Sequence, residues 1–432
     1  MIEPQVLEEY LPKQRWFGTG HGPVQSASTT VLRREWPALV QSLVQVDGVT
    51  YQVLLGLRPQ HEDFLEGKGD AVLGEIDTEL GRVVAYDAAM DPELALCLLE
   101  RAAPGEHAQR ARLLGADQSN TSIVFDERLI LKLFRRVPDG PNPDVEMTRG
   151  LADAGFGAVP RPVGEWTEGG RHLAVVVEFL ADGVDGFHLA LTSLRDLYDC
   201  KCDPWDAGGD FGPDAYRLGI ITAELHIASA AAFGTSSADP ARWADDMAAQ
   251  LARTSHPDLD ADGVHALEER LRDADAGPAI RVHGDYHLGQ AMRTAAGWYV
   301  LDFEGEPARP VEERRRPSSA LRDVAGMLRS FHYAAEVGRR EHGDDDDVSE
   351  LASAWERHNR VRFVEGYLTT PGVDAVLPST ERDRALVLAG FELDKAVYEV
   401  AYERSHRPEW VGIPLSAVQR ILEDAAHGQP TA

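Results

Sequence analysis

Apolar and polar positions alternate along the first 90 residues in runs that suit β-strands. Two such runs, residues 39–46 and 49–55, flank Asp47 and Gly48, a dipeptide that favours a two-residue hairpin turn. A run rich in leucine then predicts a helix over residues 91–105. The pattern therefore predicts a small β-rich unit over residues 1–90, followed by a different kind of structure.

A second β-rich stretch begins beyond residue 120. Residues 121–125 and 129–134 are predicted to form a hairpin, and residues 173–180 form an almost wholly apolar strand. Between them, Asn142 and Pro143 suit the N-cap and first position of a helix that ends near Gly155. Residues 91–181 are thus expected to form a second unit that combines strands and helices.

The remaining chain, residues 182–432, is predicted to be mainly helical. The only strands expected there lie between residues 280 and 303, where residues 279–282 enter a loop and Gly297 marks the turn before a second strand. The expected helices cover residues 214–233, 241–253, 262–275, 319–337, 349–368, 380–404 and 415–426. The acidic run 344–347 is expected to be a solvated loop between two of them.

Composition narrows the classes of function. The 432 residues contain 43 Lys and Arg against 72 Asp and Glu, a formal charge of −29, which argues against binding to nucleic acid or an anionic membrane. No apolar run reaches the roughly 20 residues of a transmembrane helix, and the first residues do not read as an export signal. We therefore expect a cytoplasmic protein.

The cysteines fit that expectation. Only Cys97, Cys200 and Cys202 occur, and an odd count in a long chain does not indicate a disulfide framework. The spacing of Cys200 and Cys202 is a weak metal signal without further ligands nearby, and incidental packing is the simpler interpretation.

The most informative segment is residues 283–290, His-Gly-Asp-Tyr-His-Leu-Gly-Gln, followed by an apolar strand that carries Asp302. It brings Asp285, Gln290 and Asp302 close together in sequence, at the ends of two short strands. A carboxylate that orients a hydroxyl and two oxygen ligands for Mg²⁺ are what a magnesium–nucleotide reaction needs. The alternative is a surface turn rich in Gly and Asp.

Lys132 lies in the middle of an apolar strand, where its ammonium group needs an anion to offset the cost of desolvation. Glu146, on the next predicted helix, is the expected partner, because this strand and helix resemble those of the kinase-like fold, in which such a pair positions ATP phosphates. The alternative is a strand lysine that points to solvent, because Lys132 alternates with Leu131 and Leu133.

Two further segments are candidate nucleotide contacts. The hydroxyls and amide of residues 119–122 can donate to phosphate oxygens in place of a glycine-rich loop, although a Ser/Thr-rich turn would look the same. Glu178 and Leu180 end the apolar strand 173–180, which resembles the hinge that binds adenine through its backbone in kinase-like folds. The candidate ATP ligands are Ser119, Asn120, Thr121, Ser122, Lys132, Glu146, Glu178 and Leu180.

The C-terminal half carries supporting features. His226, on a predicted helix, is expected to buttress the catalytic loop rather than to bind a ligand. The segment from Arg309 to Arg329 is basic, and within it Asp323 is expected to open or anchor a helix behind the metal site.

A stretch of acids and tyrosines follows at residues 391–404. At helical spacing Lys395, Tyr398, Glu399, Tyr402 and Glu403 share one face, and Arg407 and Trp410 follow. Carboxylates bind sugar hydroxyls and aromatic rings stack on a pyranose, so this face suits a sugar. A packed amphipathic helix with surface ion pairs explains the pattern equally well.

The loop at residues 283–290 and Asp302 resemble the catalytic motif of aminoglycoside phosphotransferases and other kinase-like small-molecule kinases. The order of elements also matches their bilobal α+β fold. The resemblance implies an N-terminal cap at residues 1–90, an ATP-binding N-lobe at 91–181, and a helical C-lobe at 182–432 with the catalytic loop and sugar site.

Over nearly the whole chain the sequence resembles the bacterial maltokinases, which phosphorylate maltose at its anomeric hydroxyl with ATP for α-glucan synthesis. The matching segments are residues 11–17, 118–122, 132–136, 283–290, 302–307, 393–399 and 407–410.

The resemblance implies ATP and Mg²⁺ as cofactors, Asp285 as the catalytic aspartate, and Gln290 and Asp302 as metal ligands, with Glu304 as a further candidate. It implies a sugar site formed by His283, His287, Tyr398, Glu399, Tyr402, Glu403, Arg407 and Trp410. It also implies a trehalose-metabolising enzyme as a candidate partner.

Two alternatives remain at this point. Related glucosamine kinases share the catalytic loop and part of the C-terminal helix, so the acceptor could be an amino sugar. A catalytically silent, kinase-like regulatory module is disfavoured because Lys132, Glu146, Asp285, Gln290 and Asp302 are all present.

Overall fold

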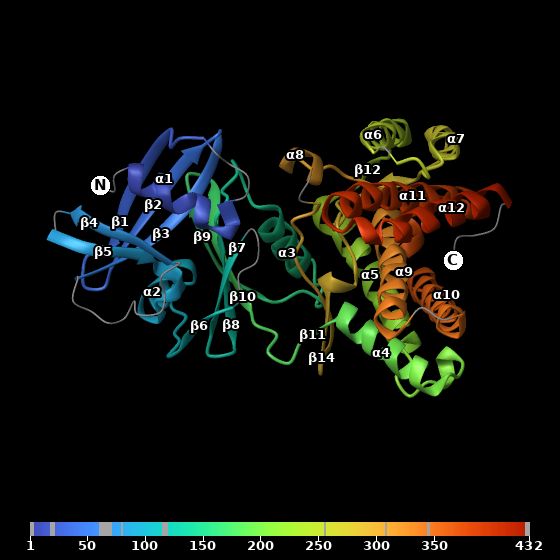
Figure 1. Cartoon of the computed structure of the whole chain (residues 1–432), viewed down its shortest axis with the longest axis horizontal. Coiled ribbons are helices and arrows are strands. Elements are labelled where there is room, and N and C mark those ends of the chain that lie inside the picture. Colours follow the sequence, from blue (N-terminus) through green and yellow to red (C-terminus); the bar gives the residue numbers. More distant parts are fainter. Residues whose placement is uncertain are drawn as a thin grey trace. The chain divides into compact units, whose positions relative to one another are not determined.

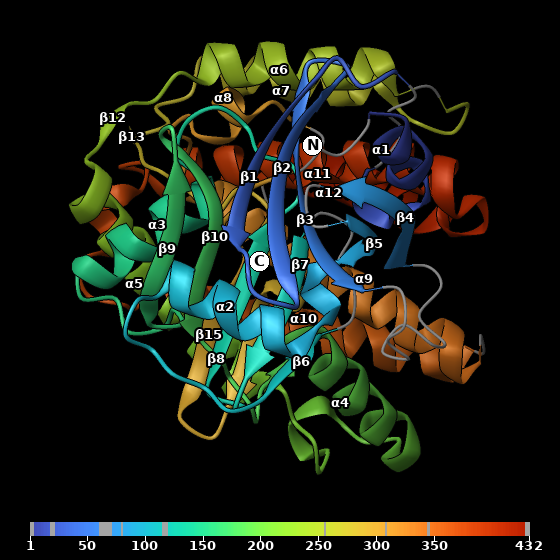
Figure 2. The same cartoon turned by 90° about the vertical axis from the view of Figure 1, so that its left-hand side faces the viewer.

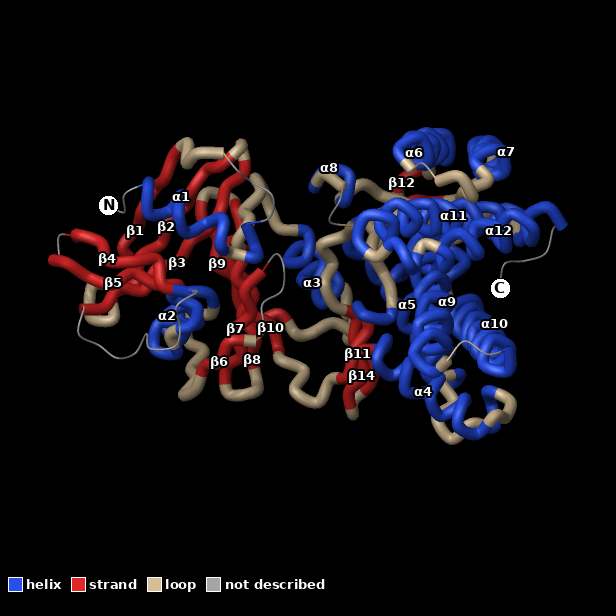
Figure 3. Tube along the Cα trace, viewed as in Figure 1, coloured by secondary structure: helices blue, strands red, loops and turns tan. Residues whose placement is uncertain are grey.

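The computed structural model describes residues 4–17, 22–59, 71–78, 81–114, 120–254, 256–306, 309–343 and 346–427. The chain folds as two compact units, one formed by Met1–Glu146 and Pro160–Ala181 and the other by Met147–Val159 and Asp182–Ala432. Most strands belong to the first unit and most helices to the second (Figure 3). Helix α3 (Pro143–Asp153) contains the point where the chain passes from one unit to the other.

The first unit begins with an antiparallel sheet whose strands lie in the order β1-β2-β3-β5-β4 (Figure 2). The predicted hairpin at its centre is confirmed, and its turn residues Asp47 and Gly48 both have positive φ, of 50° and 77°. The strands are β1 (Ser26–Arg33), β2 (Ala38–Val46), β3 (Val49–Pro59), β4 (Val72–Thr78) and β5 (Gly81–Asp87).

The basic, aromatic motif near the N-terminus packs against this sheet. After helix α1 (Pro4–Tyr10), two short 3-10 helices bury Trp16 and Phe17, and the Tyr51 hydroxyl donates to the Phe17 carbonyl at 3.2 Å. Trp16 also lies under the guanidinium of Arg135, 5.0 Å from its ring centre. This motif therefore helps to build the core of the first unit.

A second antiparallel sheet completes the first unit in the order β6-β7-β8-β10-β9. Helix α2 (Pro92–Ala102) packs against β6, β9 and β10, in an apolar core to which the first sheet also contributes. The predicted hairpin β7–β8 and the predicted strand β10 are confirmed. The strands are β6 (Ala111–Leu113), β7 (Asn120–Phe125), β8 (Leu129–Phe134), β9 (Pro162–Glu168) and β10 (Arg171–Glu178).

The second unit is mainly helical, and all seven helices predicted there are present (Figure 1). Its core forms where α5, α9 and α10 pack together, and α11 packs on α9, α12 and the pair α6–α7. These helices are α5 (Gly212–Phe233), α6 (Pro240–Arg253), α7 (Ala261–Arg272), α9 (Leu321–His342), α10 (Asp346–Leu368), α11 (Glu381–His406) and α12 (Gly412–His427).

Some local predictions were wrong. Helix α4 (Gly186–Cys200) was not predicted, although Asp185 caps it and Ala190, Leu194 and Leu197 are buried at helical spacing. The strand expected at 279–282 is reduced to β13 (Pro278–Ala279), paired with β12 (Ser236–Ser237), and a bridge at Ile280. The acidic run expected as a loop contributes its second half to the start of α10, and residues 344–345 lie outside the described residues.

A small sheet adjoins the end of the loop at residues 283–290. It contains β11 (Val184–Asp185), β14 (Ala291–Thr294) and β15 (Gly297–Val300), in the order β11-β14-β15. The short helix α8 (Val311–Arg314) follows on the way to α9.

The expectation that the cysteines form no disulfide was wrong. Cys200 and Cys202 are joined by a disulfide at the end of α4, across Lys201, while Cys97 is free.

Candidate active site

The loop at residues 283–290 is held by buried side chains of α9. Both oxygens of Asp323 accept backbone hydrogen bonds, from His283 N at 2.7 Å and from Gly284 N at 2.8 Å. Farther along the loop, Leu288 N donates to the Ser330 hydroxyl at 3.1 Å. The loop conformation is thus set by α9 as well as by the loop's own residues.

His226 supports this anchor, as predicted. Its Nε2 lies 3.2 Å from Asp323 Oδ2 and its Nδ1 lies 2.8 Å from the Tyr367 hydroxyl, and all three side chains are buried. Burial alone would raise the pKa of Asp323, but His226, His283 and the Gly284 amide lower it. Asp323 therefore stays a carboxylate that can accept both loop amides.

Close approach of α9 to the loop depends on a glycine. A Cβ at Gly326 would lie 2.4 Å from the carbonyl oxygen of Tyr286, which is far inside van der Waals contact. Gly284 in the loop has φ of 82°, a left-handed conformation that favours glycine. Gly326 therefore lets α9 approach the loop closely, and Gly284 lets the loop turn just before Asp285.

Asp285 makes an ion pair with a residue of α11. Lys395 Nζ donates to Asp285 Oδ1 at 2.9 Å. Burial alone would raise the pKa of Asp285, but the charge of Lys395, with smaller effects of His287 and His283, lowers it below its ordinary value. Burial alone would lower the pKa of Lys395, but the charges of Asp285 and Glu306 raise it above its ordinary value. Both partners are therefore charged at neutral pH.

Gln290 and Asp302, the predicted metal ligands, lie side by side. Gln290 Nε2 donates to Asp302 Oδ2 at 3.2 Å. Asp302 has φ of 65°, which is uncommon for a residue other than glycine and often marks a functional position. Glu304 follows in the same loop and its carbonyl accepts from Arg314 at 3.1 Å.

These oxygens suit Mg²⁺, which proteins usually bind through one or two carboxylates together with substrate phosphates. No cluster of three or more His, Cys, Asp and Glu side chains that could hold a metal occurs among the described residues. The protein would therefore supply few metal ligands. The candidates are Asp302 and Gln290, whose side-chain amide would have to rotate so that its oxygen faces the metal.

A polar pocket opens beside Asp285 and Lys395. Its wall includes Glu306, only 5% exposed, which accepts from Arg309 Nε at 2.7 Å and lies 3.6 Å from Arg322. Asp394 accepts from Gln250 Nε2 at 2.7 Å, and burial raises the pKa of its carboxyl against the opposing charges of Arg309 and Arg322. The residues around Asp285 thus offer both donors and acceptors for hydroxyl groups.

The space continues into a larger pocket of about 440 Å³ between α6, α8 and α11. Gln250, Glu306, Arg309 and Tyr398 line both pockets, so the two are contiguous. We call them the inner pocket, at Asp285, and the outer pocket, along α6.

The predicted sugar-binding face of α11 divides into two parts. Tyr398 lines both pockets, and its contact with a sugar stays a prediction. Glu399, however, accepts from Arg329 Nη2 at 2.6 Å, and Glu403, 2% exposed, pairs with the Tyr333 hydroxyl and with Arg407. The two glutamates therefore join α11 to α9, which corrects their prediction as sugar ligands.

The outer end of α11 is more open. Tyr402 is 42% exposed and stacks on His406, with ring centres 4.3 Å apart. Trp410 lies under Arg407, 4.6 Å from its guanidinium carbon, and next to Tyr333. Neither Tyr402 nor Trp410 lines the inner or the outer pocket.

The two loop histidines differ in their surroundings. His283 is 2% exposed, its Nε2 donates to the Leu301 carbonyl at 2.8 Å, and its Nδ1 accepts from Asp285 N at 3.4 Å. Its prediction as a substrate ligand is therefore corrected to a role in holding the loop. His287 is only half-buried, and burial lowers its pKa although Asp285 opposes this.

In the first unit, Lys132 is held by the first turn of α3. Its Nζ donates to Asp144 Oδ2 at 3.0 Å, whereas the sequence analysis named Glu146. Asn142 Oδ1 caps the helix by accepting from Asp144 N at 2.8 Å, so the cap also positions this carboxylate. The pairing with Glu146 stays a prediction.

The strand register decides which predicted phosphate ligands share a face with Lys132. Ser122 lies directly opposite Lys132, so its side chain is on the same face, and Asn120, two residues away, shares that face too. Thr121 points to the other face, where its hydroxyl accepts from Arg135 Nε at 2.8 Å. Ser119 lies outside the described residues.

The predicted hinge residues lie where the first unit ends. Glu178 closes β10, and its amide donates to the Arg161 carbonyl at 3.0 Å. Leu180 follows, half-buried, just before the boundary at Ala181. Their proposed contact with adenine stays a prediction.

Several residues of the site were not predicted from the sequence. Asp144 was not predicted as a site residue, and Lys395 was predicted only as part of a helix face. The same holds for the inner-pocket residues Gln250, Glu306, Arg309, Arg322 and Asp394, none of which was predicted as a site residue. The helical spacing of residues 391, 394, 395 and 398 was a usable signal, because all four line the inner pocket.

Comparison with known proteins agrees with this geometry. Residues 10–91 match the maltokinase N-terminal cap domain, and residues 110–305 match the phosphotransferase enzyme family. A glucosamine kinase from Streptacidiphilus jiangxiensis is 32% identical over 331 residues, which are 71% of this chain and 72% of that protein. The chain belongs to the phosphotransferase enzyme family.

Other members of the family are similar over comparable lengths. A glucosamine kinase from Mycolicibacterium smegmatis is 28% identical over 336 residues, 73% of this chain and 81% of that protein. A solved structure titled glucosamine kinase in complex with glucosamine, ADP and inorganic phosphate superposes with a TM-score of 0.71 at 23% identity. It covers 98% of this chain and 99% of that one, and confirms the predicted kinase-like fold.

Proposed function

We propose that this phosphotransferase is an ATP-dependent sugar kinase that phosphorylates maltose at its anomeric hydroxyl to give maltose 1-phosphate and ADP. The observation that carries the proposal is the ion pair of Asp285 with Lys395 in the wall of a pocket lined by hydrogen-bonding groups. A carboxylate with a lowered pKa is ionised at neutral pH and can accept the proton of a hydroxyl.

The acceptor, the nucleotide and the metal would be bound by different residues of the chain. A sugar hydroxyl in the inner pocket donates to Asp285, which orients its oxygen towards the transferred phosphoryl group and accepts its proton. Lys132, held by Asp144, binds nucleotide phosphate oxygens, and Asn120 and Ser122 lie on the same sheet face. Mg²⁺, held by Asp302 and Gln290, would neutralise charge on the phosphates.

Two features support a disaccharide acceptor. The N-terminal part of the chain matches the cap domain of maltokinases. The outer pocket of about 440 Å³ continues from the inner one past Tyr398, so a second sugar ring has space on a path that begins at Asp285. An aromatic side chain beside the path suits the apolar face of a pyranose.

Glucosamine is the second candidate acceptor. The relatives from Streptacidiphilus jiangxiensis and Mycolicibacterium smegmatis are both named glucosamine kinase. Glu306 and Asp394 place two further carboxylates in the wall of the inner pocket, where an ammonium group could pair with them. Arg309 already contacts both carboxylates, which lessens the attraction for a second cation.

One assay separates the two acceptors. ADP release is measured with Mg-ATP and either maltose or glucosamine, and the reducing-sugar signal is followed in the same sample. Phosphorylation at the anomeric oxygen prevents ring opening, so the proposal predicts that reducing signal falls one-for-one with ADP formed from maltose. ADP from maltose with a constant reducing signal would refute 1-phosphorylation. Turnover with glucosamine alone would establish the second candidate, and turnover with neither would favour a silent module.

The remaining expectations concern the cellular setting. A role in α-glucan synthesis, a cytoplasmic location and a complex with a trehalose-metabolising enzyme follow from the maltokinase resemblance and stay predictions. No described helix is long and apolar enough to span a membrane.

A further inference from the structure

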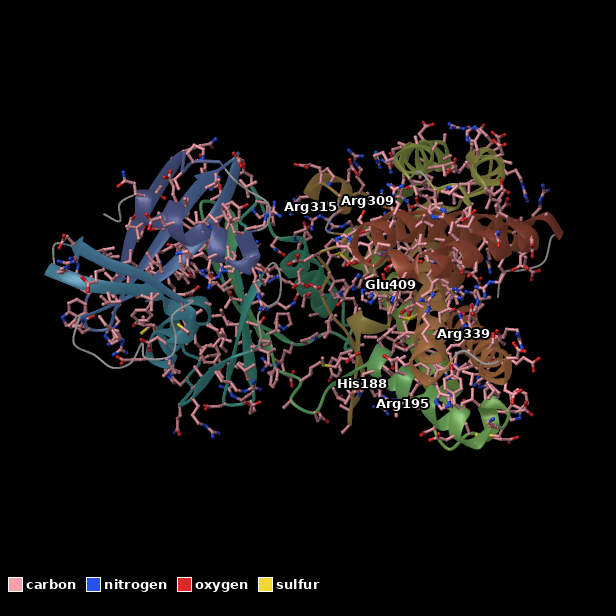
Figure 4. The ribbon with its side chains drawn as sticks, in the orientation of Figure 1. His188, Arg195, Arg309, Arg315, Arg339 and Glu409 are labelled. Carbon is pink, nitrogen blue, oxygen red and sulfur yellow. A yellow bond between two sulfur atoms is a disulfide. The ribbon has the colours of Figure 1, made fainter. Side chains whose placement is uncertain are left out.

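A third pocket, distinct from the inner and outer pockets but adjoining them, is rich in arginine. It lies between α6, the segment that follows α8, and the start of α9. Arg242, Arg309, Arg316 and Arg322 line it, in a protein whose formal charge is −29. Figure 4 labels Arg309 and Arg315, which belong to the basic segment noted in the sequence. We call this space the arginine pocket.

Polar atoms in the wall of the arginine pocket lack partners. Arg242 Nε, Trp243 Nε1 and Ser318 Oγ are buried and form no hydrogen bond with any part of the chain that the structure describes. Trp243 and Ser318 are 5% and 4% exposed. Buried polar groups are normally hydrogen-bonded, so three unpaired atoms around one pocket are unusual. All three can donate, so a ligand that pairs with them must accept hydrogen bonds.

The arginines differ in how they are engaged. Arg309 and Arg322 contact Glu306, and Arg309 also lies 3.5 Å from Asp394. By contrast, Arg242 and Arg316 form no ion pair within the described ranges of the chain. Two guanidinium groups without a carboxylate remain available for an anion.

Acidic side chains also line the arginine pocket and limit what can bind. Asp394 is occupied by Gln250 and Arg309, whereas Asp246 is exposed and Glu313 is half-buried. A ligand must therefore carry enough negative charge to compete with these carboxylates. A phosphate group does so, because it has about two negative charges near neutral pH and three acceptor oxygens, which match guanidinium donors.

We propose that the arginine pocket binds a phosphate monoester, with Arg242 and Arg316 pairing its charge and Trp243 and Ser318 supplying hydrogen bonds. The proposal extends to control of the reaction, a part that rests on the proposed sugar-kinase function. Arg309 and Arg322 belong to the walls of both the arginine pocket and the inner pocket. A bound phosphate attracts Arg322 away from Glu306, and so raises the KM of the sugar acceptor.

Binding is tested first, by calorimetric titration of the full-length protein without nucleotide. Inorganic phosphate and glucose 1-phosphate are titrated separately into wild type, R242Q/R316Q and R195Q. Arg195, labelled in Figure 4, is an exposed arginine of α4 and serves as the matched control. The proposal predicts that the double variant weakens binding about tenfold or more while R195Q stays within about twofold of wild type.

The two probes separate the sources of the phosphate. Tighter binding of glucose 1-phosphate identifies an ester site, and equal affinity for inorganic phosphate shows recognition of the phosphate group alone, which overturns the monoester assignment. Equal affinity of wild type and R242Q/R316Q for both probes overturns the site altogether. If R242Q/R316Q does not fold, R316Q alone, at an exposed position, is compared with R195Q by the same criterion.

Control of the reaction is tested separately with Mg-ATP and the sugar. Glucose 1-phosphate should raise the acceptor KM of wild type and R195Q but leave that of R242Q/R316Q unchanged, with basal ADP release similar in all three. The same rise in KM in R242Q/R316Q would overturn the coupling. Phosphate binding without any ADP release in wild type would contradict the proposed function and leave the anion site standing.

Discussion

Lys395 Nζ lies 2.9 Å from Oδ1 of Asp285, a residue 110 positions earlier in the chain. The contact joins the middle of α11 to the loop at residues 283–290, and it opposes the effect of burial on the pKa of Asp285. It gives the proposed base both its position and its ionised state.

Replacement of Lys395 should therefore move the pH dependence of turnover. In wild type the lowered pKa keeps Asp285 ionised as pH falls below neutral, so kcat/KM should persist at acidic pH. In Lys395→Met burial dominates and the pKa rises, so kcat/KM should begin to fall at a higher pH. The pH profile of kcat/KM measures this shift. Lys201→Met, at an exposed lysine, is the control and should keep the wild-type profile.

Lys132 and Asp144 should act as a pair. Each of Lys132→Met and Asp144→Asn should weaken the use of ATP, and the double variant should cost less than the sum of the two. Coupling free energies between contacting residues are about 0.5–3 kcal/mol. A cycle with Glu146→Gln is the control, because Glu146 was named as the partner from sequence. Strict additivity for Asp144 with coupling for Glu146 would show that the functional partner is Glu146.

The sequence predicted most of the fold because its signals are local. The hairpin turn at Asp47 and Gly48 and the cap formed by Asn142 depend only on neighbouring residues. Helix α4 was missed although Asp185 caps it and Ala190 and Leu194 face the core at helical spacing. A count of apolar positions from Asp185 onward would have found it.

The site was less predictable, because its key contacts join residues far apart in sequence. Spacing placed Glu399 and Lys395 on one face of α11, yet only the tertiary structure shows that Glu399 pairs with Arg329 whereas Lys395 reaches Asp285. In the same way His283 looked like a ligand until its ring was found to bond within the loop. The residue types indicated a site. Only the contacts in the structure distinguish a candidate ligand from a residue that pairs within the protein.

Asp302 should determine the requirement for Mg²⁺. In Asp302→Asn one anionic oxygen becomes a neutral amide, so a higher Mg²⁺ concentration should be needed for half-maximal activity. Titration of Mg²⁺ at fixed ATP measures the effect. Asp182→Asn, at a loop carboxylate that accepts from Ala295 N, is the control. An unchanged titration curve for an active Asp302→Asn would remove this residue from the metal site.

A buried ion-pair network should make stability depend on pH. Glu356 is 5% exposed and contacts His332 at 2.9 Å and Arg420 at 2.8 Å. Burial alone would raise its pKa, but His332, Arg420 and Arg360 lower it well below 4.5. The stability that ionised Glu356 contributes is therefore present above pH 4.5 and lost as pH falls through the lowered pKa. Glu356→Gln should lower the free energy of unfolding at neutral pH by about 3–5 kcal/mol.

Denaturant titrations at neutral and acidic pH measure this contribution. Glu356→Gln should lose less stability than wild type on acidification, because glutamine has no carboxylate that acid can protonate. Glu350→Gln, at an exposed position of the same helix, should behave like wild type. Equal pH dependence in Glu356→Gln and wild type would contradict the assignment.

The central claim is that Asp285 accepts the proton of a sugar hydroxyl during phosphoryl transfer from ATP. The most direct measurement is the rate of sugar-dependent ADP release by Asp285→Asn, with nucleotide affinity determined in parallel. The account predicts that Mg-ATP binds about as tightly as to wild type while kcat falls about 10²–10⁴-fold, the usual range for loss of a general base. A variant that keeps more than about a tenth of the wild-type kcat would contradict the claim.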